Sequence, residues 1–100
     1  MKKSSFNQII NSAPLVLIDF YADWCGPCKM LSPMLKEIAA EMKDEVKVIK
    51  IDVDRNQKLA VQYQIQGIPT IMLFKRGKQV WRQSGVPPKH QIVNMIHKHN

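Results

Sequence analysis

The sequence contains only two cysteines, Cys25 and Cys28, and Gly26 and Pro27 separate them. Two thiols at this spacing either exchange disulfides or supply half of a zinc site. Pro27 is well suited to the first turn of a helix, so Cys25 should lie at a helix N-terminus. Unpaired backbone N–H groups and the positive end of the helix dipole stabilise an anion there. We therefore expect the Cys25 sulfur to ionise more readily than a free thiol and to act as a nucleophile.

Cys28 lies one helical turn further on, which predicts a Cα separation of about 5–6 Å from Cys25 and a geometry suited to a disulfide. Attack by Cys25 on a substrate disulfide would give a mixed disulfide, and Cys28 would then release the reduced substrate. This exchange requires no metal and no organic cofactor.

Other roles for two cysteines are less consistent with the sequence. A zinc site lacks a second C-x2-C, and the spacing of His90, His97 and His99 does not give the usual H-x3–5-H ligand arrangement. Lys29 stands where a c-type haem site needs histidine. Two inert buried thiols are disfavoured because Gly-Pro between them indicates the start of a helix and not its interior.

Hydrophobic periodicity predicts a compact α/β structure around the cysteines. The run from Leu15 to Tyr21 follows Pro14 and is apolar except for Asp19, which is typical of a strand buried on both faces of a parallel sheet. Burial should raise the pKa of Asp19. The predicted strands are 15–21, 46–51, 70–74 and 79–83, and the predicted helices are 5–10, 27–42, 57–63 and 88–97. Residues 70–83 should form a hairpin whose turn places Gly77 at positive φ.

Length and composition predict one domain, residues 1–100, of ordinary globular type. Apolar residues make up 45% and charged residues 23% of the chain. Met1-Lys2-Lys3 is followed by polar residues and not by the apolar region of a secretory signal, so we expect a cytoplasmic location. The apolar run from Leu15 to Ala22 is too short to cross a membrane.

The chain is basic, with 15 Lys and Arg against 8 Asp and Glu and a formal charge of +7. Such a charge attracts acidic partners over a distance. The cations are scattered, apart from a local concentration in residues 75–78 and Arg82, and no arginine-rich or RNP-like segment accompanies them. We therefore expect a solvated surface and no nucleic-acid site.

The chain contains a set of motifs that belong together: Asp19-Phe20-Tyr21-Ala22-Asp23-Trp24-Cys25-Gly26-Pro27-Cys28-Lys29, Pro33, Lys50-Ile51-Asp52, Gly67-Ile68-Pro69-Thr70 and Gly85. Through these residues, the sequence resembles the thioredoxin family over nearly its whole length. The resemblance implies the thioredoxin fold, a central mixed sheet of four or five strands with helices on both faces. Because only Met1 to Ser4 precede the first helix, the strand that usually opens the family should be short or absent, which would leave a sheet edge open.

The resemblance also implies roles for individual residues. Cys25 would be the exposed attacking cysteine and Cys28 the buried resolving one, the two closing into a redox disulfide. Asp19 would be the general base for Cys28, although a structural carboxylate paired with Lys50 is the alternative. The supporting residues would be Gly26, Pro27, Lys50 and Pro69, with Pro69 in the cis form facing the cysteines. The backbone of Ile68 would pair with an extended substrate segment, and the apolar docking surface would comprise Trp24, Gly67, Ile68 and Gly85.

The function implied is that of a monomeric protein-disulfide reductase, which receives electrons from NADPH through a thioredoxin reductase. Two alternatives stay open: a specialised disulfide oxidase or isomerase with the same cysteines, and a redox-independent binding subunit of a larger assembly. Gly26-Pro27 favours the reductase, because related oxidases and isomerases usually carry other residues between the cysteines.

Overall fold

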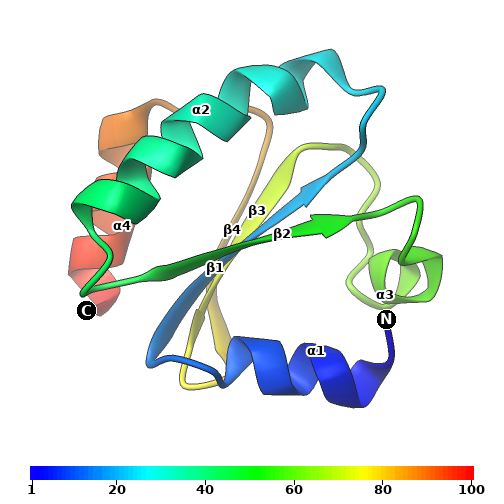
Figure 1. The fold of residues 1–100 in the computed structure, drawn as a ribbon, viewed down its shortest axis with the longest axis horizontal. Helices are drawn as coiled ribbons and strands as arrows, with labels where there is room; N and C mark the ends of the chain where they lie inside the picture. Colours follow the sequence, from blue (N-terminus) through cyan, green and yellow to red (C-terminus); the bar gives the residue numbers. More distant parts are fainter.

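The computed structural model describes residues 1–100, apart from the side chain of Lys3. The elements follow one another as α1 (Lys3–Ile10), β1 (Leu15–Tyr21), α2 (Gly26–Glu41), β2 (Lys47–Asp52), α3 (Gln57–Gln62), β3 (Thr70–Lys75), β4 (Lys78–Ser84) and α4 (Lys89–His99) (Figure 1). Each predicted element is present, and its ends fall within two residues of the prediction.

The four strands form one mixed sheet in the order β2-β1-β3-β4. β1 and β2 are parallel and joined through α2, whereas β3 is antiparallel to both β1 and β4. β1 is paired on both sides, and the residues from Leu15 to Phe20 are all buried. The continuous apolar run therefore predicted a central strand correctly.

Helices cover both faces of the sheet, with α2 and α4 on one face and α1 and α3 on the other (Figure 1). Successive side chains of a strand point to opposite faces. Leu15 and Leu17 of β1 belong to the core cluster under α2 and α4, while Val16 and Ile18 belong to the cluster against α1 and α3. The same alternation directs Asp19 toward α2.

No fifth strand is present in the part of the chain that the structure describes. Among the described residues, β1 alone pairs with β2, which therefore forms one edge of the sheet. The four-stranded form of the prediction, with an open edge, is thus confirmed.

The β3–β4 turn departs from the expectation in one residue. Gly77 has φ +83°, as predicted, but Arg76 beside it also has a positive φ of 50°. A two-residue hairpin turn of this kind needs the left-handed conformation at both central positions, and it imposes that conformation on Arg76.

Among the described residues, no helix combines the length and apolar character that crossing a membrane requires.

Candidate active site

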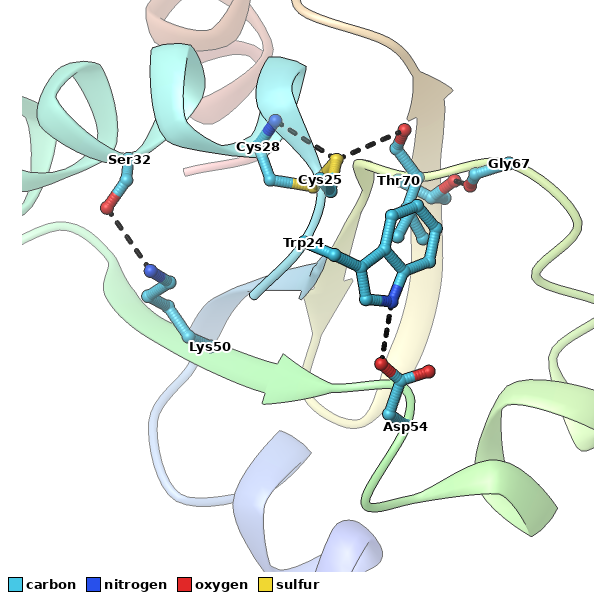
Figure 2. Close-up of a disulfide and its surroundings, with 9 residues drawn as sticks. Trp24, Cys25, Cys28, Ser32, Lys50, Asp54, Gly67 and Thr70 are labelled. Atoms are coloured by element: carbon cyan, nitrogen blue, oxygen red, sulfur yellow. Dashed lines mark hydrogen bonds between the residues drawn. A yellow bond between two sulfur atoms is a disulfide. The ribbon is translucent and has the colours of Figure 1, made fainter. Parts of the chain in front are cut away.

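The two cysteines lie where β1 leads into α2, and they form a disulfide (Figure 2). Cys25 is the N-cap of α2 in an extended conformation, and the backbone N–H of Cys28 donates to its Sγ at 3.2 Å. Pro27 stands in the first turn, as predicted. The Cα atoms are 5.3 Å apart, which confirms that one helical turn brings the sulfurs together.

Cys25 is not exposed, and the prediction that it would be exposed while Cys28 is buried is wrong for this disulfide form. The exposed fractions are 3% for Cys25 and 4% for Cys28. Ala22 forms a small buried cluster with the two cysteines, and Tyr21 and Ile68 pack against it. In the disulfide form, both cysteines are therefore buried among these neighbours.

That segment faces Cys25 from the start of β3. The carbonyl oxygen of Ile68 lies 3.7 Å from Cys25 Sγ, and the Ile68–Pro69 bond is cis, as the resemblance implies. The N–H of Gly85 donates to the carbonyl of Pro69 at 2.9 Å. The structure thus brings Gly67, Ile68, Pro69 and Gly85 to one side of the disulfide.

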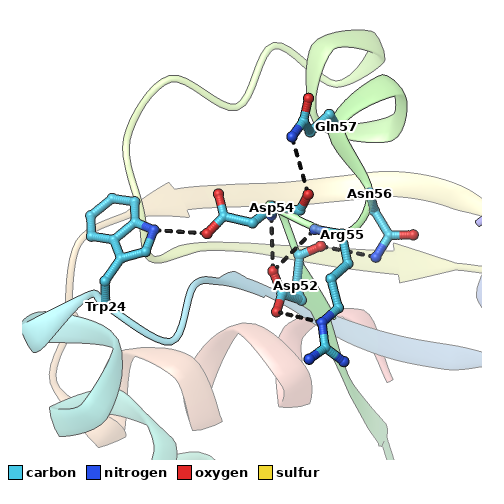
Figure 3. Close-up of polar contacts among 6 residues, drawn as sticks. All are labelled: Trp24, Asp52, Asp54, Arg55, Asn56 and Gln57. Carbon is cyan, nitrogen blue, oxygen red and sulfur yellow. Dashed lines mark hydrogen bonds and ion pairs between the residues drawn. The ribbon is translucent and has the colours of Figure 1, made fainter.

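Trp24 is the most prominent apolar group beside the disulfide, with 71% of its surface exposed. Its indole Nε1 donates to Asp54 Oδ2 at 2.8 Å (Figure 3). Asp54 belongs to a turn after β2 in which the N–H groups of Asp54 and Arg55 donate to Asp52 Oδ1 at 2.9 and 3.3 Å. This turn fixes the carboxylate that holds the indole.

The sequence reasoning missed Asp54. The signal available was Asp52-Val53-Asp54 at the end of β2, because parallel β1 and β2 end at the same edge of the sheet. Carboxylates at that edge are candidates for contact with whatever follows β1, which here is Trp24.

Asp19 is fully buried, and in the described structure neither of its carboxylate oxygens has a hydrogen-bond partner. Burial raises the pKa of Asp19 to about 6, and the positive charge of Lys50 opposes the rise only in part. The predicted direction is confirmed. A carboxyl group with this pKa can change its protonation state near neutral pH.

Lys50 does not form an ion pair with Asp19, although the two residues are register partners on β1 and β2. Its Nζ donates to Ser32 Oγ at 3.2 Å and lies 4.3 Å from the centre of the Tyr21 ring. Every ion pair within 4 Å among the described side chains involves other residues. The pairing considered as an alternative role for Asp19 is therefore not formed.

A cavity of about 280 Å³ opens beside Cys28. Tyr21, Lys29, Ser32 and Lys50 are among its lining residues. Cys28 also lines this cavity, whereas Cys25 and Ile68 do not. Within the described part of the chain, no three His, Cys, Asp or Glu side chains gather in a way that could hold a metal ion.

Comparison with known proteins points to one family. The sequence model described as Thioredoxin matches residues 1–98. Thioredoxin of Rickettsia prowazekii is 47% identical over 96 residues, covering 95% of this chain and 91% of that protein, and thioredoxin of Haemophilus influenzae is 45% identical over 91 residues, covering 91% and 85%. A mutant thioredoxin from Halobacterium salinarum superposes with a TM-score of 0.90 at 37% identity, covering 99% of this chain and 86% of that one. Oxidised thioredoxin from Plasmodium falciparum gives 0.82 at 32% identity, covering 98% and 92%.

Proposed function

This chain belongs to the thioredoxin family and is a protein-disulfide reductase with a C-x2-C active site, and on that premise we propose how its residues divide the reaction. The observation that carries the proposal is the Cys25–Cys28 disulfide at the N-terminus of α2, with the carbonyl of Ile68 3.7 Å from Cys25 Sγ.

The reduced protein starts the reaction through Cys25. Its thiolate attacks one sulfur of the substrate disulfide, the substrate's second sulfur leaves as a thiolate, and a mixed disulfide forms. Cys28 then attacks Cys25 Sγ, the Cys25–Cys28 bond closes, and the substrate's first sulfur leaves. Two electrons and two protons pass from the two thiols to the substrate, which ends as a dithiol.

Asp19 is the base that accepts the proton of Cys28 in the second step. Its place on the α2 side of β1, its unpartnered oxygens and its pKa of about 6 support this role. Asp19→Asn should slow the release of reduced substrate from the mixed disulfide near neutral pH. The step that titration of Asp19 produces in the pH profile of this release rate should be absent from the variant. A profile identical to that of the unaltered protein would contradict the role.

The substrate docks as an extended segment against Ile68, where backbone groups can recognise many sequences alike. Trp24 and Gly67 are exposed, and Ile68 and Gly85 are half-buried, so these residues can supply the surrounding surface. Gly26 and Pro27 support the site by allowing α2 to begin between the cysteines. Lys50 supports it by placing a positive charge near Asp19.

In this proposal, electrons come from NADPH through a thioredoxin reductase, and the substrates are disulfide-containing proteins. The protein works in the cytoplasm as a monomer and binds neither nucleic acid nor a membrane. Membership of the thioredoxin family supports a reductase and disulfide-containing proteins as the classes of partner. NADPH oxidation that depends on this protein, a thioredoxin reductase and a protein disulfide together tests the electron source.

Single cysteine variants test the order of events. Cys25→Ser should abolish reduction of a protein disulfide, whereas Cys28→Ser should accumulate the mixed disulfide on Cys25, visible as an adduct that dithiothreitol removes. Persistent turnover by Cys25→Ser contradicts the assignment. A redox titration separates the reductase from an oxidase or isomerase, which would have a potential well above the cytosolic poise. A binding subunit would keep its partner when both cysteines are serine.

A further inference from the structure

Arg82 of β4 binds the backbone of the segment that leads to the active site. Its Nη1 donates to the carbonyl of Tyr63 at 2.5 Å, and its Nη2 donates to the carbonyl of Gln64 at 2.8 Å. Arg82 is the register partner of Met72, which lies in the core cluster against α1 and α3. Direct partners in a sheet project to the same face, so β4 directs Arg82 toward the end of α3.

The end of α3 needs such a partner. The N–H of Gln64 donates to the carbonyl of Val61 and the N–H of Ile65 to that of Ala60, the two bonds of a Schellman motif. This motif usually places glycine at the left-handed position, but here Gln64 occupies it with φ 53°. The carbonyls of Tyr63 and Gln64 lie beyond the helix, where they carry partial negative charge and have no intrahelical donor.

The far end of the same segment is also fastened to β4. Thr70 Oγ1 and Ser84 Oγ are 3.1 Å apart and hydrogen-bonded, and the N–H of Gly85 reaches the carbonyl of Pro69. Residues 64–70 therefore span between two attachments on one strand, with Ile68 between them. Among the described residues, Arg82 has no carboxylate within 4 Å, so its hydrogen-bonding is directed at the backbone.

We propose that Arg82 is a positioning residue for substrate docking: its guanidinium fixes the Tyr63–Gln64 turn and thereby holds the backbone of Ile68 where a protein substrate pairs with it. This inference rests on the docking role proposed above for Ile68. It does not involve the cysteines, so the chemistry of a small disulfide should not depend on it.

The test compares Arg82→Met with Lys78→Met, which removes a cation from the same strand but from an exposed side chain that makes no hydrogen bond to the segment among the described residues. Insulin serves as the protein disulfide, with dithiothreitol as reductant, and dithiodipyridine serves as the small disulfide, which oxidises the pre-reduced protein in a stopped-flow experiment without dithiothreitol. For Arg82→Met, we expect the KM for insulin to rise about fivefold, the factor that one ordinary hydrogen bond supplies, with kcat and the dithiodipyridine rate unchanged. At about 0.3 M salt, where long-range attraction is screened, Lys78→Met should match the unaltered protein.

Arg82→Lys keeps the charge but has one donor nitrogen in place of the two that reach the Tyr63 and Gln64 carbonyls, so its KM should lie between those of the unaltered protein and Arg82→Met. Amide hydrogen exchange of residues 66–68 should be faster in Arg82→Met than in Lys78→Met. Equal loss with both disulfides in the arginine variants, or an unchanged KM for insulin in them, overturns the proposal.

A third variant separates this proposal from the docking proposal. Ile68→Pro removes the amide N–H of Ile68 while leaving Arg82 in place. If Ile68→Pro raises the KM for insulin but Arg82→Met does not, Arg82 alone is wrongly assigned. If Ile68→Pro leaves that KM unchanged, the docking role of Ile68 is itself wrong, and the role of Arg82 in docking fails with it.

Discussion

At the scale of single residues, Asp19 shows how a group suited to chemistry can reduce stability. The carboxyl group is buried in the central strand, and no described donor reaches either oxygen. Ionising it in the folded protein is therefore unfavourable, since a buried charge without a hydrogen bond loses its hydration. Asp19 lies on the face of β1 that packs against α2 and α4, where Leu15 and Leu17 belong to the core.

The pKa of Asp19 sets a pH dependence of folding with a definite sign. Because the folded pKa of about 6 exceeds the ordinary value of 3.8, the folded state keeps a proton that the unfolded chain loses between those values. The free energy of unfolding should then fall as pH rises through that window, by about 3 kcal/mol in all. Asp19→Asn should lack this fall and be more stable than the unaltered protein at neutral pH.

Urea unfolding from about pH 4 to about pH 8 measures the difference. Asp23→Asn is the matched control, because Asp23 is an exposed carboxylate close by in the sequence. It should keep the slope of the unaltered protein. An equal slope in Asp19→Asn would show that other groups cause the pH dependence.

Sequence alone predicts the site residues whose roles follow from their neighbours in the chain. The Cys25 pair at a helix start and Asp19 inside an apolar strand need only chain order and periodicity. The hydrogen bond from Trp24 to Asp54 and the direction taken by Lys50 depend on side-chain conformations between separate strands. The burial of Cys25 likewise depends on Ile68, 43 positions away in the chain, and local pattern carries no information on it.

At the scale of elements, β1 and α2 were predictable because each is specified by its own residues. β1 is apolar throughout except at Asp19. α2 begins at Gly26-Pro27 with Cys25 as its N-cap, and it buries Cys28, Leu31, Leu35 and Ile38 at helical spacing. The left-handed conformations of Arg76 in the hairpin turn and Gln64 at the end of α3 were not predictable, because glycine is the usual residue at such positions. Tertiary contacts determine both conformations.

The open edge of the sheet should make β2 the least protected strand next to β1. β2 pairs with β1 on one side only, and just one of its six residues, Ile51, is buried. Its outward backbone groups face solvent, so its amides can exchange through local opening. β1 is paired on both sides and buried, so opening it requires much of the core to separate.

Native-state hydrogen exchange followed by NMR measures this contrast. Amides of β1 and β3 should exchange only with global unfolding, and several amides of β2 should exchange at least about tenfold faster. β4, the opposite edge, supplies an internal comparison because it too is paired on one side. Protection of β2 equal to that of β1 would mean that contacts with α2 protect this edge of the sheet as well as strand pairing does.

At the scale of the whole molecule, charge is divided unevenly along the chain. From Arg55 to Asn100 there is no Asp or Glu, yet eight Lys and Arg fall in that range. All eight acidic residues lie between Asp19 and Asp54. Lys89 of α4 connects the two parts of the chain through Glu37 and Glu41 of α2 at 3.1 and 3.0 Å. The excess positive charge therefore belongs to the half that includes α3, the β3–β4 hairpin and α4.

This distribution should steer acidic protein substrates toward the molecule. Long-range attraction raises the rate of encounter, and salt screens it once the Debye length shortens to about 10 Å near 0.1 M. For an acidic protein disulfide, we expect kcat/KM to fall about tenfold between roughly 0.01 and 0.3 M sodium chloride, whereas the rate with neutral dithiodipyridine stays constant. Stopped-flow oxidation of the reduced protein, followed by the fluorescence of Trp24 and Trp81, measures both rates.

A variant in which Lys75 and Lys78 are both glutamine lowers the net charge without touching the disulfide, since both side chains lie at the hairpin and are exposed. Its rate with the acidic substrate should be lower at low salt and should converge with that of the unaltered protein at high salt. Charge steers only charged partners during encounter, and dithiodipyridine is neutral. The two proteins should therefore react with it at the same rate at every salt concentration. Curves that stay apart at high salt would indicate a short-range contact with these lysines in place of long-range attraction.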